Sequence, residues 1–342
     1  MDTRYMKATT GLLAVLALSL AGPGLAGAAE PTAKDFQRVV DAAYAKYKDL
    51  KDGKNADYIP ILTETPSDLF GVVIVTKDGK VYQAGDVDYV FSIQSVSKPF
   101  TAALVMTEQS PAVLKEKIGV EPTGLPFNSK LALEIYKARS VNPLVNAGAI
   151  AAVSLVQATS EQERWNKIQQ NLSDFAGRPL TVLEKVYESE YTTAFGNRAI
   201  ANQLYNTGRL YSDPEEALRV YTRECSVGVS ARDLGFMGAT LANRGVNPLT
   251  GKQVMKASDV PELLAVMATA GFYDESGDWM YTAGLPAKTG VGGGIVAVVP
   301  GRFAIAAFSP RLNEAGNSVR SLNAIRDIAG ELGVGVFGPN PN

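Results

Sequence analysis

Two apolar, hairpin-like segments near the ends of the chain constrain its fold most strongly. The first, LFGVVIVTKDGKVYQAGD (residues 69–86), predicts an apolar strand, a turn at Asp78-Gly79 and a second strand. The second, GGGIVAVVPGRFAIAAFSP (292–310), predicts two further strands around Pro300. The sequence between the two segments is mostly helical in pattern. We therefore expect one α/β body whose sheet is completed by the C-terminal hairpin.

Three helices are marked clearly by the sequence. Residues 32–50 carry the apolar side chains of an amphipathic helix at near-helical spacing: Phe36, Val39, Val40 and Ala43. Ser230 and Asp233 resemble a capping box at a helix start, and Gly245 offers the matching stop. The last helix is expected to present one apolar stripe: Val319, Leu322, Ile325, Ile328 and Leu332.

The N-terminal segment has the three-part layout of a secretory signal. Arg4 and Lys7 precede an apolar run from Gly11 to Gly22, and small residues follow, so we expect cleavage after Ala28. The run is about 12 residues long, whereas about 20 are needed to cross a bilayer, so no membrane span is expected. The mature chain is expected to be periplasmic or secreted.

The remaining residues, 29–342, are expected to form a single domain, because no internal repeat or long low-complexity linker interrupts them. Its α/β part is expected at about 29–98 and 285–342, and its mostly helical part at about 99–284. Helices would then be inserted between the two halves of one sheet.

Composition excludes several kinds of chemistry. The chain contains no histidine, which rules out Ser-His-Asp and Cys-His mechanisms and any metal site built on imidazole. Its one cysteine, Cys225, has no partner for an intramolecular disulfide. The formal net charge is −2 with no basic run, so nucleic acid is a poor candidate partner. A hydrolase of this composition needs Lys, Tyr, Asp or Glu as its base.

The stretch FSIQSVSKPF (91–100) offers such a base. On a helix, Ser95 and Lys98 would share one face, close enough for the amine to take the serine proton once burial or a nearby cation lowers the lysine pKa. Pro99 is tolerated only in about the first turn, which places Ser95 at or just before the helix start. Pro99 also biases Lys98 away from helical geometry, so the register stays open. Alone, S-x-x-K is more often a helix cap followed by a surface lysine.

A second motif strengthens this interpretation. Lys288-Thr289-Gly290 stands directly before a glycine-rich entry to an apolar strand. S-x-x-K followed by K-T-G is the pattern of serine β-lactamases and penicillin-binding proteins, in which the second motif lines the substrate cleft. Lys288 is a candidate for the cation that lowers the pKa of Lys98, and the glycines would let a substrate approach the backbone.

Several longer stretches carry a more specific resemblance. FSIQSVSKPF, NPLVNAGAI, YTRECSVGVSARDLGFMGATLANRG, GFYDESGDW and GLPAKTGVGGGI together resemble the serine-dependent bacterial glutaminases, from about Tyr58 to about Arg320. The resemblance implies a β-lactamase/DD-peptidase-like fold, with an antiparallel sheet flanked by helices and a helical subdomain. It also implies L-glutamine as the substrate, no cofactor or metal, and a homodimer or homotetramer.

The resemblance also implies roles for individual residues. Ser95 matches the nucleophile, Lys98 its activating lysine, and Tyr221 a pocket tyrosine that assists catalysis. The implied substrate-binding residues are Ser95, Asn146, Glu190, Asn197, Tyr221, Tyr273 and Val291, with Lys288, Thr289 and Gly290 supporting the cleft. These residue types suit a free amino acid, because a carboxylate such as Glu190 can pair with the ammonium group while amides and a phenol donate to the carboxylate.

We therefore predict hydrolysis of the side-chain amide of glutamine through a Ser95 acyl-enzyme. Backbone N–H groups of Ser95 and Val291 would hold the oxyanion, and Tyr221 or Lys98 would return the proton. Two alternatives remain at this point: an enzyme acting on a β-lactam or D-Ala-D-Ala peptide, and a non-catalytic amino-acid binder. Parallel assays with glutamine and a chromogenic cephalosporin separate the first, and glutamine-induced stabilisation without ammonia release would indicate the second.

Overall fold

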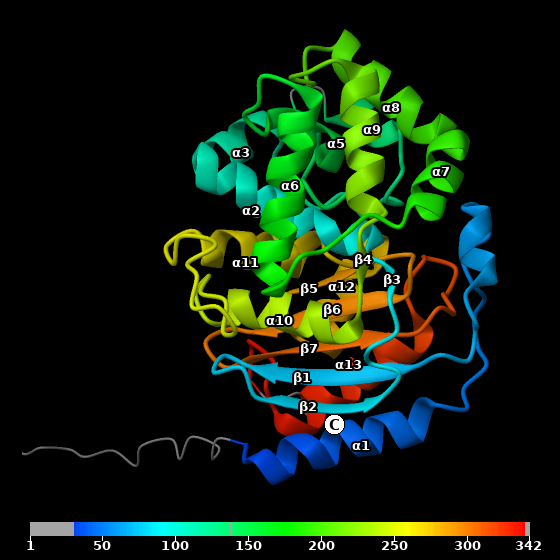
Figure 1. Ribbon diagram of the computed structural model, residues 1–342, viewed down its shortest axis with the longest axis vertical. Helices are drawn as coiled ribbons and strands as arrows, with labels where there is room; N and C mark the ends of the chain where they lie inside the picture. Colours follow the sequence, from blue (N-terminus) through cyan, green and yellow to red (C-terminus); the bar gives the residue numbers. More distant parts are fainter. Residues whose placement is uncertain (1–30, 137–138, 339–342) are drawn as a thin grey trace, which may run out of the picture. The chain divides into compact units, whose positions relative to one another are not determined.

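The computed structural model describes residues 31–136 and 139–338. Its base is a five-stranded antiparallel sheet in the order β2-β1-β7-β6-β5 (Figure 1). The strands are β1 Gly71–Thr76, β2 Val81–Gly85, β5 Ala287–Thr289, β6 Gly294–Val299 and β7 Phe303–Phe308. Both predicted hairpins are confirmed, and pairing of Ile74 with Ile305 joins the two ends of the chain in one sheet. The predicted signal, residues 1–28, lies outside the described residues.

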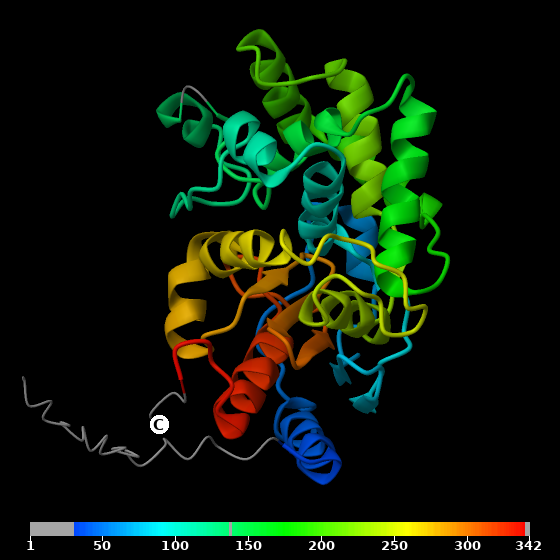
Figure 2. The same cartoon turned by 90° about the vertical axis from the view of Figure 1, so that its left-hand side faces the viewer.

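The sheet is buried on both faces, which explains its unbroken apolar strands. Successive side chains of a strand point to opposite faces, and the alternate residues of β1 accordingly belong to two different hydrophobic clusters. Val72 and Ile74 join the cluster that contains α1 (Ala33–Tyr47) and α13 (Val319–Leu332). Val73 and Val75 join the cluster beneath α10 (Ala231–Ala242). Figure 2 shows α1 and α13 next to each other below the sheet.

Helix α10 lies unusually close to the sheet because of its glycines. A Cβ atom on Gly238 would stand 2.6 Å from Ala304 Cβ and from Val296 Cγ2, closer than real contacts allow. The predicted capping box is confirmed, with Ser230 Oγ accepting from Asp233 N and the Asp233 carboxylate accepting from Ser230 N. Helix α10 thus belongs to the sheet layer although it lies within the predicted helical stretch.

The last helix differs in part from the predicted stripe. Ile325 and Ile328 are buried as expected, whereas Val319, Leu322 and Leu332 are only partly buried. Arg320 is fully buried instead, and its guanidinium donates to the backbone oxygens of Leu50 and Asp68. Leu322 and Leu332 still pack against the same cluster as Ile325 and Ile328. The arginine is buried beside this stripe because it finds backbone acceptors inside the fold.

A second layer, made of helices, lies above the sheet in Figure 1. It is formed by α2 Lys98–Glu108, α3 Pro111–Lys117, α4 Leu131–Ile135, α5 Asn146–Leu155, α6 Glu161–Ala176, α7 Glu184–Thr193, α8 Phe195–Asn206 and α9 Pro214–Cys225. Helices α11 Val260–Ala270 and α12 Ser276–Thr282 follow α10. Short elements complete the chain: β3 Phe91–Ser92 paired with β4 Gly228–Val229, and the 3-10 turns η1 Pro60–Glu64, η2 Gln94–Ser97 and η3 Tyr273–Glu275. No helix in the described ranges is long and apolar enough to span a membrane.

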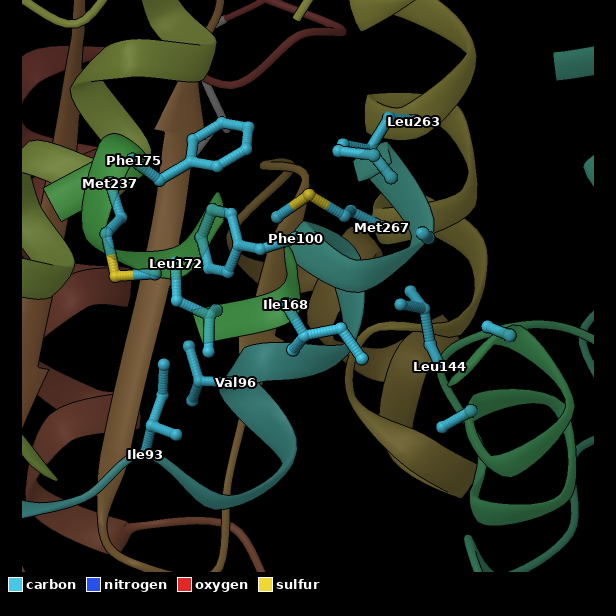
Figure 3. Close-up of a cluster of buried hydrophobic side chains, with 14 of the residues drawn as sticks. Ile93, Val96, Phe100, Leu144, Ile168, Leu172, Phe175, Met237, Leu263 and Met267 are labelled. Carbon is cyan, nitrogen blue, oxygen red and sulfur yellow. The ribbon is translucent and has the colours of Figure 1, made fainter. Parts of the chain in front are cut away.

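A hydrophobic cluster at the base of the helical layer fixes the rotation of η2 and α2. Figure 3 shows Val96 and Phe100 among side chains from α6, α10 and α11. The ring of Phe100 lies 4.9 Å from that of Phe175, centroid to centroid. Because this face is committed to the core, Ser95 and Lys98 are held on a different side of the same turn.

Candidate active site

Ser95 and Lys98 meet where η2 passes into α2. Lys98 Nζ lies 2.6 Å from Ser95 Oγ, and both side chains are buried, with 1% and 6% of Lys98 and Ser95 exposed. Pro99 is in the first turn of α2, as predicted. The expected bias of Lys98 away from helical geometry is wrong, because its φ of −53° and ψ of −46° are helical; packing of η2 and α2 overrides the local preference.

Asn146, the first residue of α5, connects three of the predicted site residues. Its Oδ1 accepts hydrogen bonds from Lys98 Nζ at 2.8 Å and from Tyr221 OH at 3.2 Å. Its Nδ2 donates to Asn197 Oδ1 at 2.9 Å. The structure therefore brings together side chains from α2, α5, α8 and α9 in one hydrogen-bonded network with Ser95.

Burial sets the protonation of this network. Desolvation lowers the pKa of Lys98, opposed by the negative charges that Cys225, Glu224 and Glu190 carry when ionised. Burial raises the pKa of Tyr221 well above that of a free phenol. The lysine is thereby biased towards its neutral, basic form, whereas the tyrosine keeps its proton and acts as a donor.

Glu190 on α7 is held by a residue next to the serine. Gln94 Nε2 donates to Glu190 Oε2 at 2.9 Å. Gln94 itself has a φ of +49°, a left-handed conformation that non-glycine residues adopt at a cost and that recurs at functional sites. Burial raises the pKa of Glu190 to about 7, although the Gln94 hydrogen bond and the charge of Lys98 oppose the shift.

Strand β5 places the K-T-G motif next to η2, the turn that carries Ser95. Lys288 Nζ donates to the backbone oxygens of Thr289 at 2.7 Å and Gly271 at 3.1 Å, and lies 4.2 Å from the ring centroid of Tyr273. Tyr273 OH donates to Thr289 O at 3.3 Å. Burial lowers the pKa of Lys288 well below its usual value, and the charge of Lys98 lowers it further. Burial, rather than Lys288, accounts for the low pKa of Lys98.

The glycines after Lys288 pack closely against the segment that carries Ser95. A Cβ atom on Gly290 would lie 3.0 Å from Ile93 O and from Val96 Cγ2, and one on Gly292 would lie 2.3 Å from Ser92 O. Side chains at these two positions would collide with the segment that carries Ser95. Val291, between them, is 5% exposed and is thereby held beside that segment.

Three residues of this region were not singled out from the sequence. Gln94 stands beside Ser95 in the S-x-x-K stretch, which was the only available signal. Glu224 follows Tyr221 by one helical turn and is 1% exposed. Burial raises its pKa to about 7, and the hydroxyls of Ser97 and Thr101 oppose the shift.

Tyr58 is the third such residue. Half of its surface is exposed (52%), yet burial raises the pKa of its phenol well above the ordinary value, and Tyr273 and Glu190 raise it further. Tyr58 is therefore a neighbour of Tyr273 and Glu190 in the candidate site. Within the described ranges, no group of three His, Cys, Asp or Glu side chains offers a metal site.

The antiparallel sheet flanked by helices, with S-x-x-K at the start of α2 and K-T-G on β5, defines a protein of β-lactamase-like fold. Comparison with known proteins narrows this class. The sequence model of the Glutaminase family matches residues 53–337. A glutaminase of Brucella canis is 55% identical over 285 residues, covering 83% of this chain and 90% of the relative.

Two solved structures are similar over most of their length. The probable glutaminase ybaS superposes with a TM-score of 0.89 at 50% identity, covering 90% of this chain and 99% of the other. A probable glutaminase from Bacillus subtilis, complexed with 6-diazo-5-oxo-L-norleucine, has a TM-score of 0.79 at 28% identity, covering 90% and 97%. The chain belongs to the serine-dependent glutaminase family and is an amidohydrolase acting on L-glutamine. This membership favours a glutaminase over the two alternatives, a β-lactam-directed enzyme and a non-catalytic binder.

Proposed function

We propose that the chain hydrolyses glutamine through a Ser95 acyl-enzyme with Lys98 as the base. The observation that carries this proposal is the 2.6 Å contact between Lys98 Nζ and Ser95 Oγ in a buried site that lowers the lysine pKa. Neutral Lys98 takes the Ser95 proton as Oγ attacks the amide carbon of the substrate. The amide oxygen then becomes an oxyanion.

Two backbone N–H groups are the proposed donors to that oxyanion, those of Ser95 and Val291. Ser95 is the second residue of η2, where amides have no acceptor within a helix. Val291 is held beside it by the close approach of Gly290 and Gly292 to the serine segment. Donors fixed before the reaction stabilise the developing charge without reorganisation.

Collapse of the tetrahedral intermediate breaks the C–N bond. The proton taken by Lys98 is passed to the leaving nitrogen, directly or through the protonated phenol of Tyr221, and ammonia departs. Water then attacks the γ-glutamyl ester and gives a proton to Lys98. Lys98 returns this proton to Ser95 Oγ as the ester C–O bond breaks, so glutamate leaves and both the serine hydroxyl and the neutral lysine are restored. The hydrogen bonds of Lys98 and Tyr221 to the same atom, Asn146 Oδ1, support this relay.

The substrate is proposed to bind by its two charged ends. Glu190 would pair with the ammonium group, because it is a buried carboxyl at the pocket with one neutral partner, Gln94. Asn146, Asn197 and Tyr273 would bind the carboxylate. The amino-acid ligand named for the Bacillus subtilis relative supports a pocket of this kind.

We also propose that residues 1–28 are an export signal and that the mature enzyme is a periplasmic or secreted homodimer or homotetramer. The basic start, apolar run and small residues before position 29 support export. Intact-mass analysis of protein from a periplasmic fraction should show a chain beginning at Ala29. Light scattering of the same sample should give two or four times its chain mass.

Ammonia release by Ser95→Ala tests the mechanism. Turnover should fall below about a thousandth of wild type, because loss of the nucleophile in another serine hydrolase costs about a millionfold. Ser97→Ala is the matched control, since this serine lies in the same turn but is not hydrogen-bonded to Lys98; it should keep most activity. Retention of more than about a thousandth by Ser95→Ala would contradict the nucleophile assignment.

A further inference from the structure

Tyr191, Arg198 and Glu215 form a polar cluster that we call the outer clamp. Tyr191 OH donates to Glu215 Oε1 at 2.5 Å. Arg198 donates to the same carboxylate through both Nη2, at 3.1 Å, and Nε, at 3.2 Å. The guanidinium also lies 5.4 Å from the ring centroid of Tyr191. One carboxylate of α9 thus receives side chains from both α7 and α8.

Two clamp residues are direct chain neighbours of pocket residues. Tyr191 follows Glu190, and Arg198 follows Asn197. Adjacent residues of a helix point about 100° apart, so each helix turns one side chain inwards and the next onto the clamp. Glu190 reaches Gln94 and Asn197 reaches Asn146 on the inner side.

The backbone at the junction between α7 and α8 does not fix the angle between the two helices, so side-chain contacts must fix it. Helix α7 ends at Thr193 and α8 begins at Phe195, with Ala194 between them at a non-helical ψ of 28°. The backbone is therefore not one continuous helix, and its hydrogen-bond ladder does not fix the angle between Glu190 and Asn197.

The acceptor of the clamp is itself held in place. Asp213 caps α9, and its Oδ1 accepts from the backbone N–H groups of Glu215 and Glu216, both at 2.9 Å. Six residues after Glu215 the same helix carries Tyr221, whose hydroxyl reaches Asn146. The clamp therefore ties α7 and α8 to the helix that supplies a catalytic-site phenol.

We propose that Tyr191, Arg198 and Glu215 are positioning residues that set the spacing and orientation of Glu190 and Asn197 for substrate binding. This inference rests on the substrate-binding roles proposed above for Glu190 and Asn197. The arginine and glutamate side chains are 31% and 38% exposed, so their ion pair alone contributes little to stability. The clamp acts on the geometry of the pocket rather than on the fold.

Tyr191→Phe is the test, because it removes the hydroxyl and keeps the ring. KM for L-glutamine should rise about tenfold, the effect of losing one hydrogen bond to a charged group, while kcat stays within about twofold. Tyr187→Phe is the matched control. Tyr187 lies one turn earlier on α7 and stacks on Tyr191 at 5.6 Å, but its ring contacts the Arg223 guanidinium, 5.4 Å from the ring centroid, rather than the clamp carboxylate. Its KM should stay within about twofold of wild type.

A second variant separates this inference from the proposed binding roles. Glu190→Gln should raise KM on its own account. If Glu190→Gln raises KM while Tyr191→Phe leaves it unchanged, the clamp proposal is overturned and the binding role stands. If Glu190→Gln also leaves KM unchanged, the binding role fails and the clamp proposal with it. If Tyr191→Phe lowers both kcat and the melting temperature but leaves KM unchanged, the role of Tyr191 is merely structural and the proposal is overturned.

Discussion

Asn146 Oδ1 accepts a hydrogen bond from Lys98 Nζ across 2.8 Å. The same oxygen accepts from Tyr221, and the Asn146 amide nitrogen donates to Asn197. A neutral amide at this point holds the proposed base without adding a negative charge that would favour its protonated form. A charged side chain at position 146 would therefore oppose the effect of burial on the Lys98 pKa.

Asn146→Asp tests this relationship with almost no change in shape. A carboxylate within hydrogen-bond distance favours lysine ammonium, so the acidic limb of the kcat/KM profile should move to higher pH by about one unit or more. The measurement is kcat/KM for glutamine between pH 5 and 10. Asn202→Asp, on the outward side of α8, serves as the control and should leave the limb in place. If the acidic limb of the kcat/KM profile of Asn146→Asp stays at the wild-type pH, residue 146 does not influence the pKa of the base.

Substrate affinity should weaken in acid because of Glu190. Burial raises the pKa of this carboxyl to about 7, and only the ionised form pairs with the substrate ammonium group. KM for glutamine should therefore rise as pH falls below about 7. Glu190→Gln should show a higher KM that no longer depends on pH in this range. A KM of wild type that stays constant from pH 8 to 5.5 would contradict the assignment.

Glu224 should make stability depend on pH in the opposite sense to an ordinary salt-bridged carboxylate. Its pKa is about 7 when folded and 4.5 in the reference state, so its contribution to stability is present below pH 4.5 and is lost as pH rises through about 7. The difference in unfolding free energy between Glu224→Gln and wild type should therefore change by roughly 2–3 kcal/mol, in favour of the variant, as the pH rises from 4.5 to 8. Urea unfolding at both values measures this difference.

The exposed Glu188, on α7, supplies the control for that experiment. Glu188→Gln should leave the pH dependence of unfolding unchanged. A Glu224→Gln curve parallel to wild type from pH 4.5 to pH 8 would mean that the Glu224 carboxyl titrates alike in the folded and unfolded chain.

Helix α10 should be sensitive to a single methyl group at Gly238. Gly238→Ala places a Cβ 2.6 Å from Ala304 and Val296, so overpacking should lower the unfolding free energy by about 1–3 kcal/mol. Gly330→Ala in α13 is the matched control, because nothing lies within 4 Å of its added Cβ. It should raise stability by about 0.5–1 kcal/mol. Equal effects of the two changes would refute the close packing of α10 on the sheet.

The sequence predicted those features that depend on local pattern. The hairpins, the helix of residues 33–47 and the Ser230 capping box follow from periodicity and short-range hydrogen bonds. Long motifs located Ser95 and Lys98 on one turn. These features need only neighbours within a few residues, so they can be read without the rest of the chain.

Other features depend on contacts between distant segments and were not predictable in this way. The partner of Gln94 lies 96 residues away at Glu190, and the buried Arg320 donates to backbone oxygens more than 250 residues earlier. The sequence indicates only a glycine-rich turn after Lys288. The reason for these glycines, their close contact with the segment of η2, depends on the three-dimensional packing. Likewise, the closeness of Lys98 to both Ser95 and Asn146 depends on where α5 docks.

Mass spectrometry after treatment with 6-diazo-5-oxo-L-norleucine, an amino acid with an electrophilic diazoketone, tests the central claim most directly. The account predicts one covalent adduct, on the peptide that contains Ser95, prevented by Ser95→Ala and by excess L-glutamate but not by Ser97→Ala. An adduct on Cys225 or another residue, or undiminished labelling of Ser95→Ala, would contradict it.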